Sequence, residues 1–255
     1  MNIRTSTNSH ICAVQYNDDT DIHIRIYYQG KRWLPPKFHL LRPLAEAKSG
    51  AIRELYNDGY WHWGTLRLQG ALDGTGIAAA ACKLNNQIEI HVYYQAEDLS
   101  LREHCHDNKG WYPGRFIDAS RPRSSQRNRN FKGEWNPGKV PGRSPINATS
   151  FMLYNDIAEI QVYWRNLQDE IVLSRYTGFW GDTAKVVEGI TSGLRFSIMG
   201  LNRREPRVYY QNGAGLVCEH CSKDGGQTWF PGWKMKVGTL SSKLHRGQLT
   251  WQATK

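Results

Sequence analysis

Hydrophobic and polar residues alternate along four similar segments of the chain, and this alternation predicts short β-strands. The segments are IRIYYQ at 24–29, IHVYYQ at 90–95, IQVYWR at 160–165 and RVYYQ at 207–211. Successive side chains of a strand point to opposite faces, so Arg25 and Tyr27 should lie on one face and Ile26 on the other. A sequence phrase that recurs several times along a chain is typical of repeated supersecondary units. We therefore expect several copies of one β-unit.

Each copy continues in the same order around this strand. A strand of small residues precedes it, as in ICAVQY at 11–16 and GIAAAACK at 76–83, and a strand that usually carries Glu follows. An aromatic turn then ends the copy, at Gly64, Gly114, Gly181 and Gly232. With one connecting strand, four short strands per copy make the blade of a β-propeller. We predict an all-β chain that forms one propeller domain over residues 1–255, with four recognisable blades.

Two segments interrupt the repeat. Residues 31–50 separate the first YYQ strand from its Glu strand, and they contain three prolines that argue against a long helix. Residues 117–134 lengthen the interval between the second and third copies. We expect both segments to be irregular excursions from the blades. The C-terminal residues 237–255 resemble the start of a further blade and are predicted to be a fragment of one.

Composition supports this architecture. The 255 residues include 10 Trp, 13 Tyr and 24 Gly, which favours many short strands joined by tight turns. The formal net charge of +10 would allow an anionic partner. However, residues 121–143 hold seven of the basic residues in a Ser-, Asn-, Gly- and Pro-rich setting that is typical of a solvated loop. Nucleic acid is therefore not the expected partner.

The chain has no 18-residue apolar run and no charged-then-apolar start, so neither membrane insertion nor a classical signal peptide is expected. We expect a cytoplasmic protein, or one released without such a signal. Its five cysteines form no even disulfide framework.

The segment CEHC at 218–221 has the spacing of a metal-binding or redox pair. Alignment of the copies places Glu219-His220-Cys221 on Glu103-His104-Cys105, within a strand where neighbouring side chains alternate. No second C-x-x-C exists. We therefore predict no metal ion and no cofactor.

Charged residues recur at one spacing in the copies. Glu103 follows His91 by twelve residues, and Glu219 follows Arg207 by the same interval. Arg25 and Glu54 are 29 residues apart, and removing 17 residues of the interrupting segment would restore twelve. The third copy has Gln161 and Leu173 instead. The contrast suggests that some copies carry a site and the third only the scaffold.

A guanidinium and a carboxylate on adjacent strands suit the vicinal hydroxyls of a sugar, whose C–H face packs on aromatic rings. Trp61, Trp111 and Trp229, each three residues before a turn glycine, are candidate aromatic walls. The same pattern also fits a simple ion pair between strands, with the Trp residues in the blade core.

With these motifs, most clearly over residues 74–116, the chain resembles the fungal fucose-specific lectins of the Aleuria aurantia lectin type. The resemblance implies a fold that is six-bladed in ancestry and binds L-fucose between blades. It also implies fucosylated glycans as partners and is compatible with a homodimer. By matching position it implies three fucose sites. These are Arg25, Glu54 and Trp61; His91, Glu103 and Trp111; and Arg207, Glu219 and Trp229.

The departures from this pattern predict unequal sites. His91 lacks the guanidinium fork, so the second site should bind fucose more weakly. The Gln161/Leu173 pocket should not bind at all. Repetition of the pattern over several copies favours multivalent binding over catalysis, since a glycosidase has one active centre.

Two other functions fit parts of the sequence. SKDGGQTW at 222–229 resembles the Asp-box of sialidases, which are also propellers, but there the box is a structural hairpin turn. A sialidase-like glycoside hydrolase is therefore one alternative. A degenerate propeller that binds polyanions through residues 121–143 is the other, and it predicts strong salt dependence.

Overall fold

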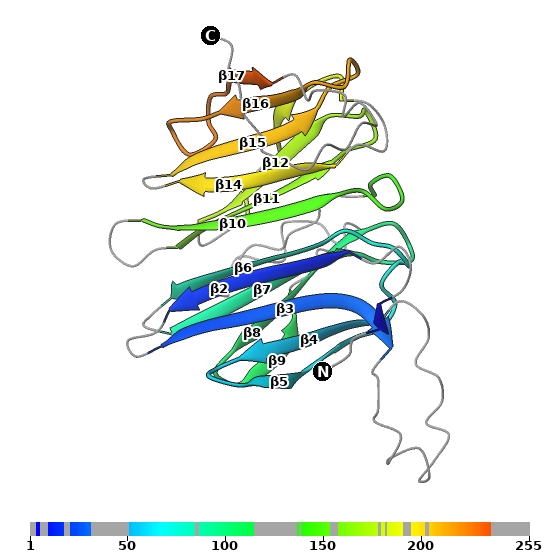
Figure 1. Cartoon of the computed structure of the whole chain (residues 1–255), viewed down its shortest axis with the longest axis vertical. Helices are drawn as coiled ribbons and strands as arrows, with labels where there is room; N and C mark the ends of the chain where they lie inside the picture. Colours follow the sequence, from blue (N-terminus) through cyan, green and yellow to red (C-terminus); the bar gives the residue numbers. More distant parts are fainter. Residues whose placement is uncertain are drawn as a thin grey trace, which may run out of the picture.

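Four antiparallel β-sheets follow one another along the chain in the computed structural model, with no helix among the described residues (Figure 1). The structure describes residues 4–5, 10–17, 21–31, 51–84, 87–114, 137, 139–153, 158–177, 180–181, 183–190, 195–201 and 204–235. Accordingly, no helix suited to crossing a membrane is found in this part of the chain.

Each sheet has four strands in sequence order, and we call the sheets blades 1 to 4. Blade 1 contains β2 (Ile11–Asn17), β3 (Ile22–Lys31), β4 (Ile52–Asn57) and β5 (Trp61–Leu68), with the short β1 (Arg4–Thr5) paired to the end of β3. Blade 2 contains β6 (Ile77–Leu84), β7 (Gln87–Gln95), β8 (Leu101–Asp107) and β9 (Gly110–Pro113).

Blade 3 contains β10 (Ile146–Met152), β11 (Ala158–Arg165), β12 (Ile171–Tyr176) and β13 (Ala184–Val187). Blade 4 contains β14 (Phe196–Leu201), β15 (Glu205–Gln211), β16 (Val217–Cys221) and β17 (Phe230–Met235). The four blades predicted from the repeats are thus confirmed. Of the segment expected to be irregular at 31–50, Lys31 ends β3 and residues 32–50 lie outside the described residues. The segment expected to be irregular at 117–134 and the expected C-terminal fragment at 237–255 also lie outside them.

The first strands of consecutive blades lie beside one another. Strand β6 contacts β2 on one side and β10 on the other, and β10 contacts β14 (Figure 1). The later strands of each blade extend away from this row. This is the radial arrangement of propeller blades that the repeat predicted.

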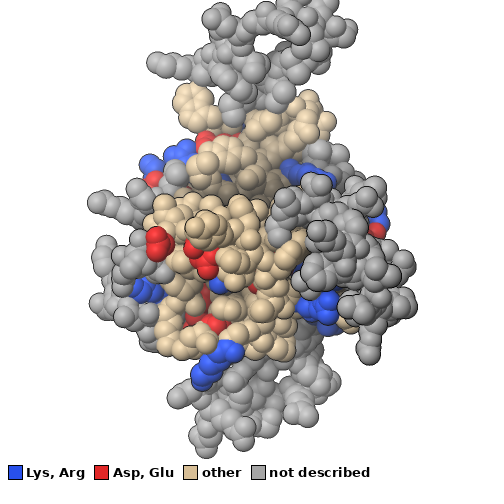
Figure 2. Space-filling view, turned by 60° about the horizontal axis from the view of Figure 1, so that its bottom comes forward, with Lys and Arg blue, Asp and Glu red and all other residues tan. Residues whose placement is uncertain are grey.

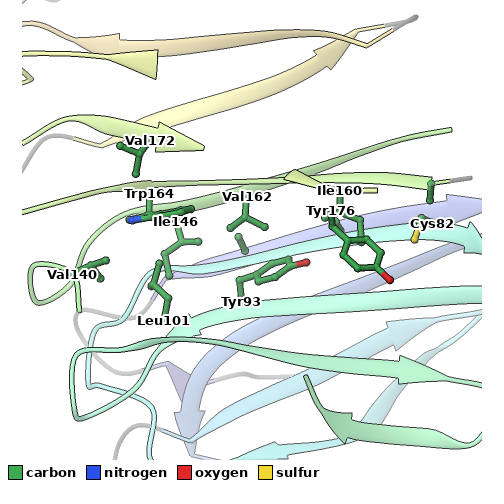
Figure 3. Packing of buried hydrophobic residues seen from close by; sticks show 13 residues of the cluster. Cys82, Tyr93, Leu101, Val140, Ile146, Ile160, Val162, Trp164, Val172 and Tyr176 are labelled. Atoms are coloured by element: carbon green, nitrogen blue, oxygen red, sulfur yellow. The ribbon is translucent and has the colours of Figure 1, made fainter. Parts of the chain in front are cut away.

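Packing between blades forms the core. Both faces of a central blade are covered, and all eight residues of β11 are buried. Ile160 and Val162 are fully buried where blade 3 meets Tyr93 and Leu101 of blade 2 (Figure 3). Two similar clusters join blade 1 to blade 2 and blade 3 to blade 4. The strands are apolar on both faces for this reason.

In two of the YYQ segments, the final Gln forms hydrogen bonds that link its blade to the next one. Gln29 is fully buried, donates to the carbonyl of Leu72 at 2.8 Å and accepts from the backbone N–H of Gly74 at 2.7 Å. Gln95 repeats this pattern with the carbonyl of Val140 at 3.0 Å and the N–H of Arg143 at 2.7 Å. These side chains satisfy backbone groups of the connecting turns.

We expect Ile160→Ala to lower the free energy of unfolding by about 2–5 kcal/mol, because it leaves a cavity between two blades. Ile22→Ala is the matched control, since the Ile22 side chain is 58% exposed and its loss should change stability by about 0.5 kcal/mol or less. Chemical denaturation, followed by tryptophan fluorescence, measures the free energy of unfolding of both variants. Equal effects of the two substitutions would contradict this account of the core.

Candidate functional site

A charged pair lies on the face of blade 1 that is turned toward blade 2. Arg25 on β3 contacts Glu54 on β4, with 2.5 Å between Nη1 and Oε1. Tyr27 donates to the same carboxylate oxygen at 3.4 Å, and the Arg25 Nε donates to the Tyr16 hydroxyl at 3.2 Å. The strand register places these side chains on one face, as alternation predicted.

The ion pair keeps Arg25 charged. Burial alone would lower the pKa of the guanidinium, but Glu54 and Tyr16 together raise it above its ordinary value. The guanidinium also lies between two rings, 5.9 Å from the centroid of Tyr16 and 5.4 Å from that of Tyr56. These contacts hold Arg25 in one orientation.

A cavity of about 240 Å³ opens beside this pair, between blades 1 and 2. Its walls are Tyr16 and Arg25 of blade 1 and Gln87, Ile88, Ile90, His106, Asp107 and Asn108 of blade 2. Burial and the positive charge of Arg25 lower the pKa of His106, so its imidazole is neutral at pH 7. The cavity thus combines charged, neutral polar and apolar walls.

Blade 4 carries an equivalent pair in a larger hollow of about 470 Å³. Arg207 Nη1 lies 2.9 Å from Glu219 Oε1, and Tyr209 donates to the same oxygen at 2.8 Å. The backbone N–H of Trp233 donates to the other oxygen at 3.1 Å. The Arg207 side chain is 34% exposed, so it is accessible from this hollow.

Three of the glycines that were expected to end aromatic turns are required because a glutamate side chain lies over each of them. The expectation of a turn was wrong for two of them, since Gly64 lies within β5 and Gly232 within β17, and Gly114 directly follows β9. A Cβ at Gly64 would overlap the carboxylate of Glu54, and one at Gly232 would overlap that of Glu219. At Gly114 it would lie 2.5 Å from Glu103 Oε2. Gly181, in the copy without glutamate, has only a carbonyl oxygen 3.6 Å away. The glycine and the glutamate therefore form one structural unit.

The pocket beside His91 and Glu103, which we call the second pocket, is filled by protein side chains. His91 stands where blades 1 and 4 have arginine, and its Nδ1 lies 2.9 Å from Glu103 Oε1. Both side chains are less than one tenth exposed. The His91 ring is 6.5 Å from that of Tyr176 in blade 3, and Tyr176 packs in turn against Trp180 at 5.4 Å. The pair is thus covered by the next blade.

The pocket beside Gln161 and Leu173, which we call the third pocket, is filled by the Asp-box segment at 222–229. This segment forms the hairpin turn between β16 and β17. The carbonyl of Gly225 accepts from Gln161 at 2.8 Å and from Arg175 at 3.2 Å. A Cβ at Gly226 would lie 2.8 Å from Leu173. Asp224 closes the turn by accepting from Thr228 and from the N–H of Gln227. The structural role expected for the Asp-box is confirmed.

In the structure, Trp111 and Trp229 do not lie beside the glutamate of their own copy, with which the sequence pattern grouped them. Trp111 stacks on His104 at 6.0 Å, on the face of blade 2 opposite to Glu103, and its ring meets Tyr27 of blade 1 edge-on at 6.0 Å. Trp229 meets Tyr163 of blade 3 in the same way, at 6.2 Å. Each tryptophan therefore faces the preceding blade. For Trp111, in β9, the reason is that alternation along the strand turns it away from Glu103.

The pockets are regrouped accordingly. Trp111 belongs beside Arg25 and Glu54, not beside His91 and Glu103. Trp229 belongs to the third pocket. Trp61 pairs with Asn57, lies on the face of blade 1 opposite to Glu54, and is 46% exposed. Trp180 takes the corresponding place against Tyr93 of blade 2, at 6.2 Å.

The fungal fucose-specific lectin family model matches residues 34–136. The curated fucose-specific lectin of Aleuria aurantia is 23% identical over 246 residues, which are 94% of this chain and 65% of that protein. The fucose-specific lectin of Aspergillus fumigatus is 28% identical over 183 residues, or 68% of this chain and 52% of that protein.

The chain is thus similar to the fungal fucose-specific lectins, through the family model over residues 34–136 and through these relatives over most of its length. It spans between about half and two thirds of the length of the lectins that it matches. A solved structure of the Aleuria aurantia lectin, described as a six-bladed β-propeller, superposes with a TM-score of 0.67 at 22% identity. That superposition covers 94% of this chain and 66% of the other. The predicted β-propeller fold is confirmed.

The sequence pattern did not reveal two wall residues of the first cavity, His106 and Tyr16. His106 lies in the HCH segment at 104–106. Its neighbour Cys105 points to the opposite face, since His106 pairs with Trp111 and Cys105 with Tyr112. The same alternation separates Cys218 from Cys221, so CEHC does not form a pair of ligands.

Gly64→Ala should lower the free energy of unfolding by about 1–3 kcal/mol, because the new methyl group displaces the Glu54 side chain from a packed position. The control is Gly181→Ala, where no glutamate lies over the glycine and the change should be about 0.5 kcal/mol or less. Urea denaturation compares the two, and similar losses would refute the proposed role of the glutamate.

The Glu219 carboxyl should titrate far below the usual range. Burial would raise its pKa, but the hydrogen bonds from Arg207, the N–H of Trp233 and Tyr209 lower it to about 2. A carboxyl with a lowered folded-state pKa stabilises the protein above its unfolded pKa, near 4.3, and this contribution is lost as the pH falls toward 2. NMR titration of the side chain would measure the value. Arg207→Met should raise it, and an unchanged pKa in this variant would contradict the assignment.

Proposed function

We propose that the chain is a lectin that binds L-fucose in the spaces between blades and catalyses no reaction. The observation that carries the proposal is the cavity beside Arg25 and Glu54, which is open and has an apolar wall on the next blade. Both relatives named above are fucose-specific lectins. The Aleuria aurantia lectin has also been solved in complex with α-methyl-L-fucoside.

The chemistry of the first cavity suits a deoxy sugar. Arg25, which lines the cavity and is held in place by Glu54, donates hydrogen bonds to sugar hydroxyls. The neutral imidazole of His106 can do either, depending on its tautomer. Ile88 and Ile90 supply an apolar surface on which the methyl group of fucose would lose contact with water. Trp111 contacts the lining residue His106, with the ring centroids 4.9 Å apart.

Arg207 and Glu219 form the second proposed site. Phe230 and Trp233 line the same hollow, and their side chains are 38% and 56% exposed. They provide aromatic surface for the C–H face of a sugar. Trp233 takes the role that the sequence pattern suggested for Trp229.

The other two pockets contribute little to sugar binding in this proposal. Tyr176 and Trp180 cover His91 and Glu103, and Gly225 and Gly226 fill the space beside Gln161. Two unequal sites on one rigid scaffold would still gain avidity on a surface that carries many fucosylated glycans.

Binding without catalysis fits the state of the carboxylates. A glycoside hydrolase needs a general acid whose pKa is raised so that it holds a proton near neutral pH. The pKa of Glu219 is instead lowered to about 2 by its donors. The Glu219 carboxylate is therefore suited to accept hydrogen bonds and not to donate a proton.

Binding of polyanions finds less support among the described residues. In the view of Figure 2, lysine and arginine lie in small separate groups with acidic residues between them. Of the basic residues at 121–143, Lys139 and Arg143 are described, and Arg143 Nε donates to the carbonyl of Asp73 at 3.1 Å.

Titration calorimetry with methyl α-L-fucoside tests the proposal. We expect saturable heat that is insensitive to salt, since the ligand is neutral. Arg25→Ala and Arg207→Ala should each abolish or weaken one class of site by at least about tenfold, because each loses charge-assisted hydrogen bonds worth about 1.5–3 kcal/mol.

Arg102→Ala is the matched control, since it removes an exposed arginine that pairs with Asp98 at 2.8 Å outside the cavities. Its binding heat should equal that of the unaltered protein. No heat from folded protein would refute fucose binding. Heat that falls steeply with salt would favour polyanion binding instead.

A further inference from the structure

Three side chains of different chemistry meet beneath the covered second pocket. The ligand atoms of His91, Glu103 and Cys105 all lie within 4.8 Å of one another. His91 Nδ1 is 2.9 Å from Glu103 Oε1 and 3.4 Å from Cys105 Sγ. His91 lies on β7 and the other two on β8, so the group is brought together across strands and not by a sequence motif.

These separations match those of ligands around one metal ion. Zinc takes sulfur at about 2.3 Å and nitrogen or oxygen at about 2.0–2.2 Å, usually in a tetrahedron. Two ligand atoms at those bond lengths lie roughly 3–4 Å apart. The N···S distance of 3.4 Å falls within this range, and the N···O distance of 2.9 Å lies just below it.

A second observation concerns the other nitrogen of the same imidazole. His91 Nε2 is buried without a hydrogen bond, and Glu89 Oε2 lies 3.7 Å from it. A histidine that binds a metal through one nitrogen usually donates its other N–H to a carboxylate, which fixes the ring. Glu89 stands near that position, and a movement of about 0.5–1 Å would bring its oxygen to hydrogen-bond distance.

We propose that His91, Glu103 and Cys105 bind one zinc ion, or a divalent ion of similar softness, with Glu89 orienting the imidazole. A thiolate, an imidazole and a carboxylate are the ligands that zinc prefers. On binding, the thiol of Cys105 releases its proton to solvent and the sulfur forms the bond to the metal. A water molecule or Cys82, which the register places on the same face of blade 2, would complete the tetrahedron.

Three blades carry this glutamate, and a comparison with blade 4 explains why only blade 2 would bind a metal. Blade 4 has Glu219 and Cys221 at the positions of Glu103 and Cys105, but Arg207 stands where blade 2 has His91. A guanidinium has no lone pair to offer a metal. Blade 1 has Arg25 and, in place of the cysteine, Tyr56. The replacement of arginine by histidine therefore removes a sugar contact and completes a ligand set.

Cobalt(II) is the probe for this site, because tetrahedral cobalt with a thiolate ligand has intense visible bands and a sulfur-to-metal charge-transfer band. We expect the intact chain, after removal of metal with a chelator, to bind one cobalt ion with these bands. Zinc should displace the cobalt and bleach them. Equilibrium dialysis with zinc would give the same stoichiometry.

Two variants and one matched control identify the ligands. His91→Arg restores the residue of blades 1 and 4, so it should keep the fold, and it should lose the cobalt bands together with at least about a hundredfold in affinity. Cys105→Ser should lose the charge-transfer band. Cys221→Ser, which removes the equivalent cysteine of blade 4, should bind cobalt as the unaltered chain does.

Circular dichroism and the melting temperature establish that each variant is folded. Absence of cobalt binding by the intact chain would overturn the proposal, and so would bands that persist in His91→Arg or disappear in Cys221→Ser. Fucose binding plays no part in this readout, so the metal site stands or falls independently of the lectin function.

Discussion

The structure depends on the face-to-face packing of neighbouring blades. A four-stranded antiparallel sheet of this size buries little by itself, and here each central sheet is covered on both faces. The edge-on contact between a tyrosine of one blade and a tryptophan of the next recurs at three interfaces, with ring centroids 6.0–6.2 Å apart. Buried glutamines bind the connecting turns at two of these interfaces. Packing and connection together fix each blade against its neighbour.

This constraint also decides where chemistry can occur. A charged side chain on a blade face enters an interface, where it must be paired and hydrogen-bonded to be tolerated. Arg25 and Arg207 meet this condition through glutamates that lie over glycines of the last strand of the blade. Since the opposite wall of the space comes from the next blade, a binding site needs two copies of the repeat. That is the physical reason why the tryptophan beside Arg25 comes from blade 2.

Small changes at one position then give the interfaces different properties. Where arginine is kept, as at Arg25, a cavity remains open beside the ion pair. Where Gln161 replaces it, the Asp-box turn of the next blade fills the space and its carbonyl takes the hydrogen bonds. Where His91 replaces it, the pocket is closed and three potential metal ligands meet. One scaffold thus supports an open, a filled and a potentially metal-binding interface.

The sequence by itself determined the blades and the charged pairs. Alternation along IRIYYQ and its copies, and the recurring interval of twelve residues, are local properties that a strand and its partner convert directly into one face. Arg25 and Glu54 were matched in this way across an interruption, and the structure pairs them. The reason for Gly64 and its equivalents was not visible, because it lies in the position of a glutamate side chain on another strand.

Only the tertiary structure decided which blade supplies the opposite wall and which pockets stay open. Trp111 is near Glu103 in sequence but faces Tyr27 of the preceding blade, and Gly225 closes a pocket whose strands begin more than 50 residues earlier. The meeting of His91 with Cys105 likewise follows from strand pairing. Contacts between blades depend on how whole sheets pack against each other. The spacing of residues within one copy does not specify that packing.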